Sequence, residues 1–284
     1  MGIDWKSAYA AGQAKTSSAA AVPTAAPIIA AQVKKPAATT SAPSVAAPSS
    51  TNSAEKSYAT SSSSSVKTLF SAIKGLADDV KAFGTPTKGT GSIVSYAGNI
   101  GSPEGSNMMK VSAVGDYKYT NTFVNTASKA MTIVVWNKAA SDKSGTVQAN
   151  LGSCIASTSP ALSITLAPGE SQVVAFQEDT QAGWAEATSD VAVSGAYATT
   201  WGEINYIDTG CGYDVSSIMN VHGNTYDMAI SAKETDCISD MTQNLWIGRN
   251  NNPEDPIPIG NSDGSCFIPA GKCTVTTKMG GQKS

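Results

Sequence analysis

The segment SITLAPGESQVVAF, from Ser163 to Phe176, predicts two β-strands joined by a tight turn. Ile164 and Leu166 alternate with polar residues, which is the period of a strand that buries one face. The dipeptide Pro168-Gly169 is typical of a turn, and a second run rich in valine follows it. We therefore expect a β-hairpin here.

Other segments between residues 85 and 284 have the same character. The strings SIVSYAG, KYTNTFVN, MTIVVWNK and TVQANLG are short, rich in β-branched and aromatic residues, and separated by turn residues. No helical segments alternate with them, so a parallel α/β sheet is not expected. The pattern predicts an all-β domain, a β-sandwich over residues 85–284.

The chain before residue 85 divides into two parts. Residues 1–65 are mostly Ala, Ser, Thr and Pro, which bury too little apolar surface to offset their ordering entropy, so we expect a disordered arm. Its composition suits an O-glycosylated stalk or a plain flexible linker. Over residues 66–84, apolar residues at helical spacing predict an amphipathic helix that packs on the β domain.

Composition excludes several classes of partner. The net charge is −3, charged residues make up 14% of the chain, and Arg249 is the only arginine. Binding to nucleic acid or to anionic membranes is therefore not expected. No apolar run approaches the ~20 residues that a membrane-spanning helix needs, so we expect no membrane insertion.

Five cysteines and a single histidine are present, without a C-x-x-C pair, so we expect no metal site and no cofactor. The string CFIPAGKC resembles a short hairpin that would bring Cys266 and Cys273 together. Cys211 and Cys237 would then form a second disulfide, leaving Cys154 unpaired. Five buried, reduced thiols are the alternative.

The candidate functional residues lie in and near TWGEINYIDTGCGYDVSSIMNVHG, which begins at Thr200. Trp201 and Glu203 share one face of a strand. A tryptophan beside a carboxylate suits a sugar, because the ring covers C–H groups and the acid accepts hydroxyl donors. Trp184 also flanks an acidic stretch, so Trp184 and Trp201 are the candidates for sugar stacking. A half-buried strand with a solvated glutamate is the alternative.

Several segments resemble known families. WGEINY and YDVSSIMNVHGNTYDMAIS resemble the signature of thaumatin-like proteins, in the family's order. GSNMMKV, YKYTNTF, VVWNK, LAPGESQVVAFQEDTQAGWA, TTWGE and GYDVSSI resemble, again in order, secreted fungal proteins of the Asp f 4 allergen type. These resemblances imply a thaumatin-like β-sandwich, a secreted protein whose signal peptide has been removed, and oxidised cysteines.

The thaumatin-like resemblance also implies an acidic cleft that binds β-1,3-glucan and in some members hydrolyses it. Glu203 and Asp214 match two of the cleft acids. Met219 and Asn220 stand where a further aspartate is expected, and no arginine precedes Trp184. If the chain were a glycoside hydrolase, Glu203 would be the proton donor and Asp214 the base or nucleophile.

We therefore expect a secreted fungal cell-wall or cell-surface protein without catalytic activity. It would bind β-glucan or a related polysaccharide through Trp184, Trp201, Glu203 and Asp214, or contact a host surface as an allergen or effector. One alternative is an endo-β-1,3-glucanase that uses Glu203 and Asp214. The other is a structural wall protein without a specific ligand.

Overall fold

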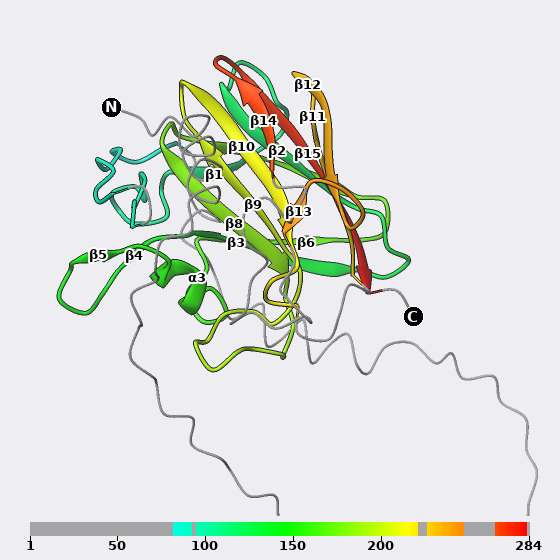
Figure 1. The fold of residues 1–284 in the computed structure, drawn as a ribbon, viewed down its shortest axis with the longest axis horizontal. Coiled ribbons are helices and arrows are strands. Elements are labelled where there is room, and N and C mark those ends of the chain that lie inside the picture. Colours follow the sequence, from blue (N-terminus) through cyan, green and yellow to red (C-terminus); the bar gives the residue numbers. More distant parts are fainter. Residues whose placement is uncertain (1–81, 93–94, 221–225, 247–264, 283–284) are drawn as a thin grey trace, which may run out of the picture.

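The computed structural model describes residues 82–92, 95–220, 226–246 and 265–282 (Figure 1). The predicted arm over residues 1–65, and the predicted helix up to residue 81, lie outside the described residues. Among the described residues the regular secondary structure is almost entirely β-strand, which confirms the predicted all-β class. None of the described helices is long and apolar enough to span a membrane.

One sheet has six strands. Its two central strands, β2 (Tyr119–Asn125) and β15 (Cys273–Gln282), run parallel to each other, and β15 lies near the C-terminus of the chain. All its other strand pairs are antiparallel. In spatial order its strands are β1 (Met108–Val111), β7 (Ser171–Phe176), β2 (Tyr119–Asn125), β15 (Cys273–Gln282), β11 (Tyr226–Ala232) and β12 (Thr235–Asp240).

The second sheet has seven strands, and its centre is an antiparallel meander of β8, β9 and β10. In spatial order its strands are β13 (Leu245–Trp246), β10 (Gly210–Ser216), β9 (Trp201–Tyr206), β8 (Thr180–Glu186), β3 (Met131–Asn137) and β6 (Leu162–Leu166), and β14 (Cys266–Pro269) also pairs with β10.

A small two-stranded sheet and a short helix lie beside the second sheet. The strands are β4 (Ala140–Ser141) and β5 (Val147–Gln148), and the helix is α3 (Leu151–Ile155). The segment TVQANLG, which predicted a strand, contributes only β5 before α3 begins. The described part of SIVSYAG forms only an isolated bridge at Ala97.

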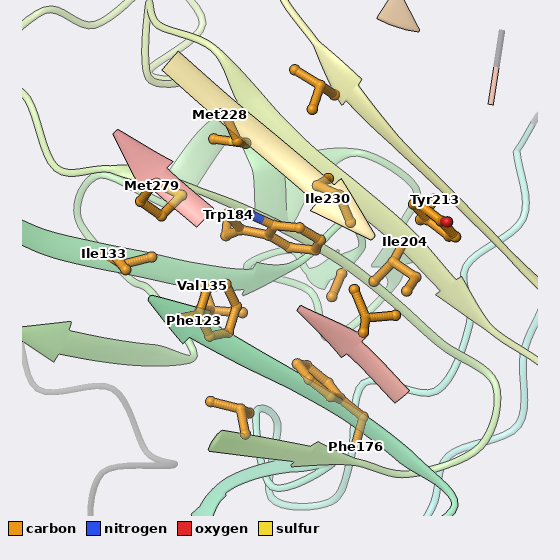
Figure 2. Packing of buried hydrophobic residues seen from close by; sticks show 14 of the residues in the cluster. Phe123, Ile133, Val135, Phe176, Trp184, Ile204, Tyr213, Met228, Ile230 and Met279 are labelled. Carbon is orange, nitrogen blue, oxygen red and sulfur yellow. The ribbon is translucent and has the colours of Figure 1, made fainter. Parts of the chain in front are cut away.

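The main core lies between the two large sheets, where alternate residues of each strand point inward. Figure 2 shows the ring of Trp184 among residues that both sheets contribute, and its edge meets Phe123 with ring centroids 5.5 Å apart. Gly202 lies against the Trp184 indole, since a Cβ atom there would come within 2.2 Å of the ring. The glycine therefore makes room for the largest side chain of the core.

Both predicted hairpins are wrong in one respect, because their strands belong to different sheets. After Leu166 the chain crosses from β6 in the seven-stranded sheet to β7 in the six-stranded sheet. The side chain of Asn125 fixes this crossing by donating to the Leu166 carbonyl at 3.0 Å. CFIPAGKC crosses in the same way from β14 to β15. Each crossing lets two apolar strands face each other across the core instead of pairing edge to edge.

Candidate functional site

Glu203 and Asp214 lie directly opposite each other on β9 and β10, where they are partners in the antiparallel register. Their chain neighbours Ile204 and Tyr213 point into the core. Because side chains alternate along a strand, both acids point to the outer face of the seven-stranded sheet. Opposed residues in such a pair have Cβ atoms about 4.5–5.5 Å apart, so the structure brings the two predicted acids together.

Lys138 is the third member of this site, and no pattern in the sequence indicated that it lies there. It follows β3, and its backbone N–H donates to the Gln181 carbonyl at 2.9 Å, which continues the pairing with β8. Its Nζ atom lies 2.8 Å from Oε1 of Glu203, and the two side chains are 26% and 19% exposed. The cation beside Glu203 therefore comes from the residue that follows β3, which lies on the other side of β8 from β9 in the sheet.

A glycine on β8 makes room for a tryptophan beside the acids. Gly183 on β8 lies between β3 and β9, opposite both Trp136 and Glu203 in the register. A Cβ atom at Gly183 would come within 2.7 Å of the Trp136 indole. The Trp136 indole thus lies against the Gly183 backbone on the outer face of the sheet, on the same face as the acids.

The protonation of the site follows from burial and charge. Burial, and next the negative charge of Glu203, raise the pKa of Asp214 to about 8, although Lys138 and a hydrogen bond from Ser265 oppose the shift. Burial alone would lower the pKa of Lys138, but the charge and hydrogen bond of Glu203 outweigh it, so this pKa is raised. Near neutral pH Asp214 is therefore mostly protonated, beside the ion pair of Lys138 and Glu203.

Asp214 also connects the site to a tryptophan. Ser265 Oγ donates to Asp214 Oδ1 at 3.1 Å, and Trp246 Nε1 donates to Ser265 Oγ at 3.2 Å. Trp246 is half-buried, whereas Oδ2 of Asp214 is fully buried and has no hydrogen-bond partner among the described residues. Sequence reasoning missed Ser265 and Trp246, because β13 and β14 follow Asp214 by thirty residues or more.

Neither tryptophan predicted for sugar stacking is accessible. Trp184 is 0% exposed and lies between the sheets. Trp201 is 8% exposed, packs edge-on against Trp136 with ring centroids 5.2 Å apart, and donates its Nε1 proton to the Tyr197 carbonyl at 2.9 Å. Their assignment as binding residues is therefore wrong, because both indoles serve as core, one on each side of the seven-stranded sheet.

The predicted disulfide pairs are also wrong. Cys237 on β12 is bonded to Cys266 on β14, with Cα atoms 5.6 Å apart, so the bond links the two large sheets. Cys211 and Cys273 are buried thiols and Cys154 is a half-buried thiol. Within the described residues, no group of three or more histidine, cysteine or acidic side chains could hold a metal ion.

A cavity of about 210 Å³ lies beside α3, away from the acids. Its lining includes Glu104, Trp136 and Ile155, but neither Glu203 nor Asp214. The acid pair therefore lies on the outer face of the sheet and is not part of this cavity.

Comparison with solved structures finds chains of low sequence identity, among them the following two. The protein elicitor MoHrip2 from Magnaporthe oryzae is 9% identical, with a TM-score of 0.33 over 57% of this chain and 98% of its own. The thaumatin-like xylanase inhibitor TLXI is 12% identical, with a TM-score of 0.32 over 56% of this chain and 97% of its own. At these scores we base no functional argument on either likeness.

Comparison with curated sequences gives a stronger relation. The chain is 36% identical to Allergen Asp f 4 of Aspergillus fumigatus over 159 residues, which are 52% of this chain and 47% of that protein. It thus spans about half the length of this relative. The family profile described as the Allergen Asp f 4-like domain matches residues 106–279, which is more than half of the chain and includes every residue of the site. The protein therefore belongs to the Allergen Asp f 4-like family.

Proposed function

We propose that this protein is secreted by a fungus and binds β-glucan or a related wall polysaccharide at the cell surface without cleaving it. The observation that carries the proposal is the opposed pair of Glu203 and Asp214 with Lys138 beside it. Secretion is supported by the family relation and by the disulfide, since disulfides persist in oxidising compartments. Contact with a host surface is compatible with the same location.

The charges of the site favour a neutral ligand. With Asp214 protonated, the ammonium of Lys138 and the carboxylate of Glu203 cancel each other. A carboxylate accepts hydrogen bonds, an ammonium donates them, and a carboxylic acid does both, which matches the hydroxyl groups of a glycan. We assign the stacking role to the half-buried Trp246, in place of Trp184 and Trp201.

Two features favour binding over hydrolysis. Glu203 is held in an ion pair with Lys138, so its carboxyl group is not free to act on a substrate. One oxygen of Asp214 is fully buried, and the other accepts a hydrogen bond from Ser265. A glycoside hydrolase needs both carboxyl groups facing the scissile bond at a defined separation.

Retention on insoluble polysaccharide tests the proposal. We expect the protein to sediment with β-1,3-glucan, and we expect Glu203→Gln and Trp246→Ala each to weaken the retention at least about tenfold, since ~1.4 kcal/mol of lost contact corresponds to a factor of ten. Glu178→Gln is the control, because Glu178 forms an exposed ion pair with Lys118 outside the site. A wild-type protein that binds neither β-glucan, chitin nor mannan would remove the binding proposal and leave a structural wall protein.

The raised pKa of Asp214 keeps a second function open, an endo-β-1,3-glucanase. Its roles would be the reverse of those expected from the sequence, with Asp214 as the proton donor and Glu203 as the ionised partner. Reducing-sugar release from laminarin tests this function. An activity that Asp214→Asn reduces at least ~100-fold would support it, and absence of release by the wild-type protein would refute it.

A further inference from the structure

Two of the remaining cysteines lie in the core between the sheets, each near the start of its strand. Cys211 lies on β10 of the seven-stranded sheet and Cys273 begins β15 of the six-stranded sheet. They are 1% and 0% exposed, and both belong to the core between the sheets. Their thiols are close enough for a side-chain hydrogen bond, and both also lie near the hydroxyl of Tyr206.

The neighbouring disulfide shows that the sheets come within bonding distance at this end. Cys211 is opposite Ile268 and Tyr213 is opposite Cys266 in the β10–β14 pair, so Cys211 and Cys266 lie close together on the inner face. Cys266 already reaches across to Cys237 on β12, with Cα atoms 5.6 Å apart. That separation is within the usual range for disulfides.

We propose that Cys211 and Cys273 form a second disulfide, which links the two sheets through the core. In this step both S–H bonds break and one S–S bond forms. The two electrons and two protons reduce a disulfide oxidant, such as glutathione disulfide, to two thiols by thiol–disulfide exchange. Because both sulfurs are sealed in the folded protein, the exchange takes place during folding, before the core closes. Cys154 remains the single free thiol.

Counting thiols in the protein folded in a glutathione redox buffer tests this inference without any substitution. The folded protein is unfolded in guanidinium chloride with N-ethylmaleimide and no reductant, and its intact mass is measured. We expect one adduct, located by peptide mapping at Cys154, and five adducts after reduction, because the chain has five cysteines. Three adducts, or an adduct at Cys211 or Cys273, would overturn the proposal.

A matched variant checks the assignment. Cys154→Ser folded under the same conditions is expected to give no adduct, and a peptide pair joined through Cys211 and Cys273 is expected in the unreduced digest. A digest in which either residue is joined to another cysteine would contradict the proposed pairing. None of these outcomes depends on polysaccharide binding.

Discussion

Asp214→Asn is expected to change how stability depends on pH. The folded-state pKa of Asp214 is raised from 3.8 to about 8, first by burial and then by Glu203. The folded protein therefore holds a proton that the unfolded chain releases once the pH exceeds about 4. The stability that protonated Asp214 contributes is fully present below the pKa of the unfolded chain. It is lost as the pH rises towards the pKa of Asp214 in the folded protein. Asparagine carries no such proton, so the variant gains stability relative to wild type over this window.

The size of the effect follows from the two pKa values. Each pKa unit is worth about 1.36 kcal/mol, so the interval between 3.8 and about 8 sets a ceiling of roughly 6 kcal/mol. Asp214 is half-buried, and its neighbours Lys138 and Glu203 are partly exposed, so solvent reduces the effect. We expect the free energy of unfolding of Asp214→Asn to rise relative to wild type by about 2–4 kcal/mol between pH 4 and pH 8.

Denaturant unfolding at one-unit pH intervals measures this difference. Asp179 and Glu186 also have raised pKa values, mainly through burial, so wild type alone would not isolate Asp214. The comparison with the variant removes their contributions, and Glu178→Gln is the control for loss of an exposed acid. A difference between variant and wild type that stays constant from pH 4 to pH 8 would refute the assignment of a protonated Asp214.

Three further predictions concern the disulfide, the close packing at a glycine and one hydrogen bond. Replacing Cys237 and Cys266 by alanine opens a bond between residues 29 apart, and it should lower the free energy of unfolding by about 3–4 kcal/mol in thermal or denaturant melts. Gly202→Ala should lower the free energy of unfolding by ~1–3 kcal/mol, because its Cβ would come within 2.2 Å of the Trp184 indole. Gly212→Ala should be tolerated in the same melts, because no atom lies nearer than 4.0 Å to the position of its Cβ. Tyr226→Phe removes a hydroxyl that donates at 2.9 Å to the half-buried carboxylate of Glu186, so it should lower the free energy of unfolding by about 1–3 kcal/mol at pH 7 in the same melts. An unchanged free energy of unfolding would mean that water replaces the lost donor.

The candidate site was partly predictable. Residue pattern and family resemblance identified Glu203 and Asp214, and the strand register brings these two together. Lys138 was not predictable, because it is near Glu203 only through the order in which β3, β8 and β9 assemble. The choice of Trp184 and Trp201 as binding residues was wrong, because both side chains are buried. The alternation of residues along a strand does not distinguish a tryptophan that faces solvent from one that faces a second packed layer.

The sequence by itself determined the all-β class, several of the strands and which residues of a strand share a face. These properties are local, since alternation of apolar and polar side chains depends only on neighbours along the strand. The tertiary structure alone decided that Ser163–Phe176 and Cys266–Cys273 cross between sheets, that Cys237 bonds to Cys266, and that a lysine joins the acids. Those outcomes depend on which strands lie next to each other. The alternation of apolar and polar side chains within one strand is the same whether that strand pairs with the next strand in a hairpin or packs against another sheet across the core.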